Sequence, residues 1–146
     1  MPSYSFKDVT ATLVGPTGAF SLGYGSGVAK EGIDIDPAAD KNTMTIGADG
    51  EGMHSLHADK SGKITVRLLK TSPRNQQLQA AYDAQSISAA LWGKNIITVS
   101  NTAVGDLHVA REVAFKKKTG IKYAEDGDIV VWEFDAIKID SVMGTY

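Results

Sequence analysis

Two pairs of closely spaced carboxylates are the first candidates for chemistry in this sequence. Glu133 and Asp135 are two residues apart, as are Asp34 and Asp36, and both pairs lie in stretches that alternate apolar and polar residues. Alternate residues of a strand project from one face, so each pair predicts an acidic row. A catalytic pair of carboxylates needs an enclosed site that separates the two pKa values. A flat strand lacks that enclosure, so we predict a solvated or lumen-facing row and no catalytic site.

Metal and phosphate sites are the next possibilities. His54 and His57 are three residues apart, but the surrounding glycines and the following Asp-Lys-Ser-Gly turn favour extended structure, which would place the two rings on opposite faces. Residues 34–40 lack the central glycine and the closing glutamate of a calcium loop. The glycines at 23, 25 and 27 open no helix that could bind phosphate. We therefore predict no metal, no cofactor and no enzymatic activity.

The composition is that of an ordinary globular protein. Its 146 residues fit one domain with its own hydrophobic core. The chain is 42% hydrophobic and 22% charged, and its longest apolar run is too short to cross a bilayer. It has no cysteine, which excludes disulfides, and its formal net charge of -2 gives no reason to expect sequence-specific nucleic-acid binding. We expect a soluble protein without a signal peptide or a membrane anchor.

Residues 57–82 are the clearest structural signal, because a strand there leads directly into a helix. Alternation over residues 63–70 predicts a half-buried strand. Ser72 is expected to cap the helix, with Pro73 at its first position. The inward face of the strand is expected to carry Ile64, Val66 and Leu68. The helix has a narrow apolar stripe made of Leu78, Ala81, Tyr82 and Gln85.

Other alternating runs predict that the chain is mainly β. Strands are expected at residues 4–14, 19–22, 32–36, 95–100, 107–116 and 129–140. In the last of these, Trp132 and Phe134 belong to the core face. In the strand before it, the expected apolar face is Leu107, Val109, Val113 and Phe115, with Arg111 interrupting it. One helix would therefore pack against one sheet.

Residues 37–55 form an unusually long, polar and glycine-bearing connection. Within it, only residues 43–46 and 52–53 suggest extended structure, and residues 47–50 read as a turn. One interpretation is a mobile surface loop. The other is a projecting hairpin arm whose apolar side chains, Met44, Ile46 and Met53, are buried only by a neighbouring subunit.

Several stretches together resemble the tail tube proteins of contractile-tailed bacteriophages, a family formerly described only as phage proteins of unknown function. The resemblance is carried by the turn at residues 59–62, the strand at 64–69 and the junction Thr71-Ser72-Pro73-x-Asn75-x-x-Leu78. It is supported by the loop at residues 40–50, the closing strand at 127–134 and the ending Gly144-Thr145-Tyr146. The likeness extends over essentially the whole chain.

The resemblance implies an α+β fold: an antiparallel β-sandwich or small barrel with one flanking helix, forming a single domain over residues 1–146. It implies a structural virion protein of the tail, assembled in the cytoplasm of the host bacterium. Its subunits would form stacked six-membered rings inside the sheath protein. The lumen would hold the tape-measure protein and then phage DNA, neither bound sequence-specifically.

The resemblance also suggests roles for particular residues. The arm at 37–55 would contact the next ring through Thr43, Met44, Ile46, Asp49 and Met53. Candidates for lining the lumen are Asp34, Asp36, Glu133 and Asp135, and the sequence does not choose between the two pairs. Two alternatives stay open: the tube of a related machine, such as a phage-derived bacteriocin or a type VI secretion apparatus, and a small ligand-binding β-sandwich.

Overall fold

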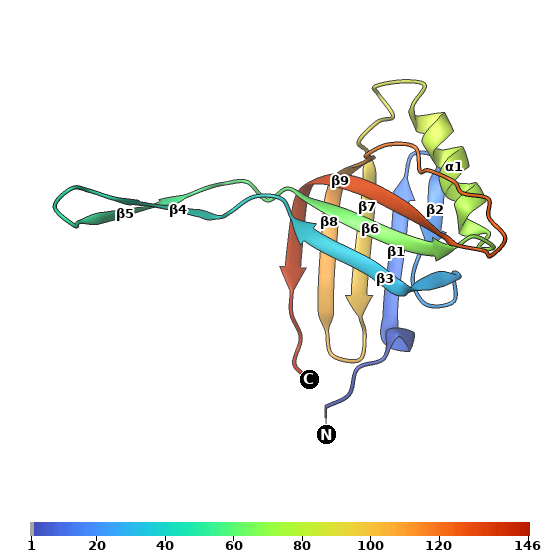
Figure 1. The fold of residues 1–146 in the computed structure, drawn as a ribbon, viewed down its shortest axis with the longest axis horizontal. Helices are drawn as coiled ribbons and strands as arrows, with labels where there is room; N and C mark the ends of the chain where they lie inside the picture. The colour runs from blue at the N-terminus through green and yellow to red at the C-terminus, as the bar shows by residue number, and fades with distance from the viewer. Residues whose placement is uncertain (1) are drawn as a thin grey trace.

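The alternating segments of the chain pair as strands of one large antiparallel sheet (Figure 1). The computed structural model describes residues 2–146, apart from the side chains of residues 29–31. The sheet has seven strands in the order β2-β1-β7-β8-β9-β6-β3. They are β1 (Val9–Gly15), β2 (Gly18–Ser21), β3 (Val28–Pro37), β6 (Gly62–Leu69), β7 (Asn95–Asn101), β8 (Asp106–Phe115) and β9 (Ile129–Val142), and a short 3-10 turn, η1 (Phe6–Asp8), precedes β1.

One helix, α1 (Arg74–Gln85), follows β6 and packs beside β1 and β2 (Figure 1). Its predicted stripe is confirmed, since Leu78, Ala81 and Gln85 are buried and Tyr82 packs against the core. The Gln85 and Asn95 side chains are buried together and exchange two hydrogen bonds of 2.8 and 2.7 Å, which tie the helix end to β7. The predicted class, mainly β with one flanking helix, is therefore confirmed.

The sheet folds over its own core instead of remaining flat. In Figure 1, β3 and β6 cross in front of β1, β7 and β8. The core contains inward residues of both parts, including Leu13 and Ile97 from one and Ile64 and Val66 from the other. An aromatic cluster fills the centre, and its members are Tyr82, Trp92, Phe115, Trp132 and Phe134. Burial of these rings makes this body the stable part of the molecule.

The expected alternation of β8 is wrong in its first half. Leu107, which was expected to face the core, is exposed. Ala110, which was expected on the opposite face, is buried. The cause is a bulge: the register with β7 shifts between the Asn95–Val113 and Ile97–Ala110 pairs. Glu112 has a φ of 54°, which lies in the left-handed region that non-glycine residues rarely adopt. The extra residue reverses which side chains point inward, so only Val113 and Phe115 match the prediction.

The expected helix cap is also wrong in detail. Pro73, not Ser72, occupies the N-cap position of α1, with helical φ and ψ. The Ser72 hydroxyl donates a 2.5 Å hydrogen bond to the Ser26 carbonyl and accepts a 3.3 Å one from the Arg74 amide. Ser72 therefore joins the start of the helix to the loop between β2 and β3, and so fixes tertiary structure as well as the helix end.

A second, two-stranded sheet lies apart from the body. Strands β4 (Asn42–Ile46) and β5 (Gly52–Leu56) pair only with each other among the described residues, and they connect β3 to β6. Figure 1 shows this hairpin, hereafter the arm, extending well away from the body. Within residues 2–146, no helix has the length and apolar character needed to cross a membrane.

Candidate functional site

The arm is held together by its backbone and its turn. The Gly47 amide donates to the Glu51 carbonyl at 2.7 Å, which closes a five-residue loop over residues 47–51. The Asp49 carboxylate accepts from the Glu51 amide at 3.1 Å, and Gly50 has a φ of 89°, which a side chain would strain. Asp49 is therefore already used within the arm as a turn-forming residue.

The arm has one apolar face and one more polar face. In the hairpin register, Met44 lies opposite His54, Asn42 opposite Leu56, and Ile46 opposite Gly52, so these six residues share one face. Thr43, Thr45, Met53 and Ser55 share the other. The five residues proposed from the sequence therefore do not form one surface, because Met53 lies on the face opposite Met44 and Ile46. Leu56, which sequence reasoning missed, joins the apolar face.

The apolar face of the arm is uncovered in the single subunit. Met44 is 62% exposed, Ile46 is 55% exposed and Leu56 is 84% exposed. Of the ten residues in the two strands, all but Ser55 are exposed. An isolated two-stranded hairpin is at best marginally stable in water. The arm therefore presents apolar surface and little packing of its own.

The two histidines near the arm serve as hydrogen-bond partners within it. His54 Nδ1 lies 3.1 Å from the Asn42 amide nitrogen, and His57 Nε2 lies 2.7 Å from the Thr43 hydroxyl. Both contacts join β4 to the chain in or just after β5. Within the described part of the chain, no group of three or more His, Cys, Asp or Glu side chains is placed to hold a metal ion.

Both predicted acidic pairs lie on one face of the sheet. Across β3, β6 and β9, one row of paired residues is Asp36, Lys63 and Asp135. The neighbouring row on the same face is Asp34, Thr65 and Glu133. The face is opposite the core, because the alternate residues Ile64 and Phe134 are buried. The two pairs are therefore parts of a single surface, which we call the charged face.

Cations interrupt the acidic rows. Arg67 contacts Asp34 at 2.7 Å and Lys116 contacts Glu133 at 3.6 Å, while Lys63 lies between Asp36 and Asp135 in the register. Four carboxylates against these three cations leave one net negative charge on the group. Each of the two ion pairs has one half-buried and one exposed partner, and ion pairs at a protein surface contribute little to stability, about 0–1 kcal/mol each. Their effect here is to make the charged face nearly neutral overall.

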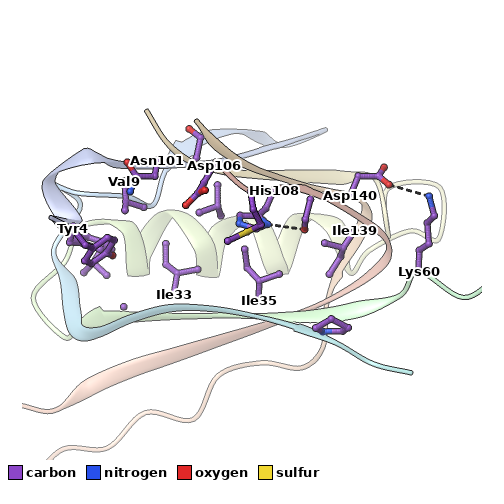
Figure 2. A pocket seen from close by; sticks show the side chains of 18 of the residues that line it. Tyr4, Val9, Ile33, Ile35, Lys60, Asn101, Asp106, His108, Ile139 and Asp140 are labelled. Carbon is purple, nitrogen blue, oxygen red and sulfur yellow. Dashed lines mark hydrogen bonds and ion pairs between the residues drawn. The ribbon is translucent and has the colours of Figure 1, made fainter. Parts of the chain in front are cut away.

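An open cleft of about 1050 Å³ lies between β3 and the ends of β7, β8 and β9 (Figure 2). Its walls are largely apolar, and Figure 2 shows Ile33 and Ile35 of β3 pointing across the space towards His108 of β8. His108 Nδ1 lies 2.8 Å from the Ser141 hydroxyl. At the other end, the loop before η1 contributes Tyr4. Sequence reasoning missed this cleft entirely.

One end of the cleft carries a cluster of ionic groups. Asp140 contacts Lys60 at 3.3 Å and Arg111 at 2.5 Å. The hydrogen bond from Lys60, followed by that from Arg111, holds the pKa of the Asp140 carboxyl below its usual value. Hydrogen bonds from Ser61 likewise lower the pKa of Asp59. Both carboxylates are ionised at neutral pH; Asp140 of β9 holds Lys60, just after the arm, whereas Asp59 accepts a hydrogen bond from the Ser61 amide within its own turn.

The sequence matches the bacteriophage PhiTE tail tube protein family over residues 1–144, and the chain belongs to that family. The resemblance inferred from the sequence is therefore confirmed. A comparison with curated proteins finds no match.

Chains of several solved structures share the fold of this protein. A chain of the cryo-EM structure of an extracellular contractile injection system, the PVC sheath-tube complex in the extended state, matches with a TM-score of 0.58 and 14% identity, covering 99% of this chain and 93% of that one. A chain of the anti-feeding prophage baseplate matches with a TM-score of 0.60 and 9% identity, covering 97% and 96%. A chain of the PVC sheath/tube terminator in the extended state matches with a TM-score of 0.56 and 15% identity, covering 98% of this chain and 96% of that one.

The chain is thus a tail tube protein of a phage or phage-like particle, and a structural component rather than an enzyme. This conclusion rests on family membership over nearly the whole sequence, with the shared fold as independent support.

Proposed function

We propose that copies of this chain assemble as six-membered rings, which stack into a hollow tube inside a contractile sheath. The observation that carries this proposal is the arm, which extends from a well-packed body and leaves its apolar face uncovered. Uncovered apolar surface on a projecting element favours burial against a partner. The matching PVC chain belongs to a sheath-tube complex, which supports self-association beside a sheath.

The lumen of such a tube would hold the tape-measure protein during assembly in the host cytoplasm and conduct phage DNA during infection. We assign the charged face, with Asp34, Asp36, Glu133 and Asp135, to the lumen. Its near-neutral balance of charge suits a conduit, because strong net positive charge would bind the phosphate backbone. Its small negative excess, repeated in every subunit, would repel DNA weakly.

Removing the arm tests the assembly. Deleting residues 43–52 should leave a folded body, because the core residues lie outside the deleted segment, but should abolish tubes in negative-stain electron microscopy. A finer variant replaces Met44 and Ile46 by serine, with Thr43→Ser and Thr45→Ser on the opposite face as the matched control. Long tubes formed by the deletion variant would refute the proposed role of the arm.

Reversing charge tests the lumen. Changing Glu133 and Asp135 to lysine should permit tube assembly but slow or block DNA ejection, because the lumen would then bind phosphate. Asp126→Lys, on an exposed loop, is the control for added positive charge. Normal infectivity of virions that carry the Glu133 and Asp135 substitutions would contradict the assignment of this face.

A phage-like injection machine is a second candidate, favoured by the fold shared with the PVC and anti-feeding prophage structures. The ring, the tube and the arm would be the same, and only the cargo would differ. Nuclease-protected DNA in purified particles would indicate a phage, and particles that never contain DNA would indicate an injection machine.

A further inference from the structure

The body has a second broad outer face, on the half of the sheet formed by β1, β7 and the first part of β8. Because Leu13 and Ile97 are buried in the core, the residues next to them along each strand point outward. In the strand register, these outward residues form two rows: Thr10, Ser100 and Leu107, and Thr12, Thr98 and Val109. We call this surface the neutral face.

The neutral face is distinguished by its lack of charge. Strands β1, β2 and β7 contain no Asp, Glu, Lys or Arg, although 22% of the whole chain is charged. Val14, Ile96 and Leu107 are exposed on this half of the sheet, and β2 is the edge strand beside β1. Soluble proteins commonly protect exposed sheet edges with charged side chains. An uncharged face with exposed aliphatic groups therefore favours cover by a partner.

The neutral face and the charged face lie on opposite sides of the subunit. The two layers of the folded sheet enclose one core, to which Leu13 contributes from one layer and Ile64 from the other. Figure 2 shows the layers from the side, with Ile33 and His108 between them. Within residues 2–146, α1 packs on the core side through Leu78 and leaves the neutral face open.

This opposition determines what each face can meet in a tube. The charged face is the one assigned above to the lumen, so the neutral face points away from the tube axis. A ring places its copies side by side, and a stack places rings end to end. Neither arrangement covers a face that points radially outward. In the proposed assembly, the sheath is what lies outside the tube.

We propose that the neutral face is the surface that carries the sheath, and that it takes a flat, uncharged partner surface of aliphatic, hydroxyl and amide groups. The inference rests on the proposed tube inside a contractile sheath, and it names the tube surface that meets the sheath. The centre of the contact is the pair of rows that contains Thr12, Thr98 and Val109.

An uncharged contact suits a sheath that changes length around the tube. Ion pairs act over about 8 Å at physiological ionic strength, and they fix one register because each charge must meet its opposite. Burial of small aliphatic groups is non-directional, and dispersion contacts weaken within about 1 Å of separation. The neutral face can thus hold the extended sheath through many weak contacts and release it during contraction.

A charge of either sign at the centre of the face tests the proposal. Tubes of Thr98→Glu or Thr98→Lys should form, but should bind at least about tenfold less of the sheath protein of the same particle, measured by co-sedimentation. The reason is that each copy would bury an unpaired charge. Thr98→Val keeps the face uncharged and should bind within about twofold of wild type. Thr71→Glu, in the exposed turn before α1, is the control for added charge.

Circular-dichroism melts of the free subunits check folding. If a charge at Thr98 unfolds the subunit, Thr10→Glu and Thr10→Lys test the same face at an exposed position. Four results would overturn the inference: sheath binding that both charges leave unchanged, binding that one sign weakens and the other strengthens, folded variants that no longer form tubes, and particles that keep their sheath but eject DNA slowly.

The third result would place the neutral face between copies of the tube protein, and the fourth would place it in the lumen. Failure of the wild-type protein to form rings or tubes would instead refute the proposed function, and the sheath contact with it.

Salt provides a second test that needs no substitution. Raising the ionic strength from about 0.1 to about 1 M shortens the range of charge interactions from about 10 to about 3 Å. Sheath protein bound to wild-type tubes should change by less than about twofold, because the proposed contact contains no ion pair. Loss of most of the bound sheath protein at the higher ionic strength would show a contact held by charge, and would overturn the inference.

Discussion

The arm and the β6–β9 ladder are both antiparallel strand pairs, yet their surroundings differ completely. In the body, Ile64, Val66 and Leu68 of β6 are buried against the core, beside Trp132 and Phe134 of β9. In the arm, the two strands bury no side chain. The comparison shows that strand pairing alone does not make a stable element. The body carries the stability of the subunit, while the arm leaves Met44, Ile46 and Leu56 exposed.

A matched pair of leucines gives the largest expected contrast. Leu68 is fully buried and Leu56 is 84% exposed. Leu68→Ala should lower the free energy of unfolding by about 2–5 kcal/mol through lost burial and a residual cavity. Leu56→Ala should change it by less than about 0.5 kcal/mol. Chemical denaturation of the free subunit measures the unfolding free energy of each variant. Similar losses in the two variants would contradict the difference between body and arm.

Two glycines give a smaller contrast of the same kind. A Cβ at Gly62 would lie 2.6 Å from the Asp36 carbonyl oxygen, where the backbone must move. A Cβ at Gly52 would meet only the terminal methyl of Ile46, at 2.9 Å, which can rotate away. Gly62→Ala should therefore cost about 1–3 kcal/mol of stability.

Gly52→Ala should leave the melting temperature of the free subunit unchanged while weakening tube formation, since it displaces Ile46. Thermal melts followed by circular dichroism, together with sedimentation of tubes, separate the two effects. An equal loss of thermal stability in both variants would show that the arm is part of the folded body.

The smallest expected effect on stability is that of substituting Asp140, which lies at the junction of body and arm. Its pKa is lowered in the folded state by Lys60 and Arg111, so its contribution is present above the unfolded pKa of about 3.9 and is lost as pH falls through the lower folded value. Asp140→Asn should therefore melt slightly below wild type at neutral pH and match it at strongly acidic pH. A difference that grows on acidification would contradict this assignment.

Local patterns predicted the body well. Alternation identified the inward faces of β6 and of the first half of β9, and spacing identified the stripe on α1. These predictions needed only the neighbours of each residue along the chain. They failed at the β8 bulge, because the positive φ of Glu112 has no signal in residue type.

The candidate surfaces were less accessible to sequence reasoning, because they depend on pairing between distant segments. The two acidic pairs share one face only because β6 lies between β3 and β9. The cleft exists because β3 lies across from β7 and β8, and no pattern of neighbouring residues in the sequence predicts it. The face that each side chain of the arm occupies depends on the hairpin register, which puts Met53 opposite Thr45 and on the other face from Met44.

Hydrogen exchange measured on the free subunit and on assembled tubes tests the central claim most directly. The account predicts that amides of β4 and β5 exchange rapidly in the free subunit and become strongly protected in tubes, while those of β6 and β9 are protected in both. Arm amides that are already protected in the free subunit, or that stay unprotected in tubes, would contradict it.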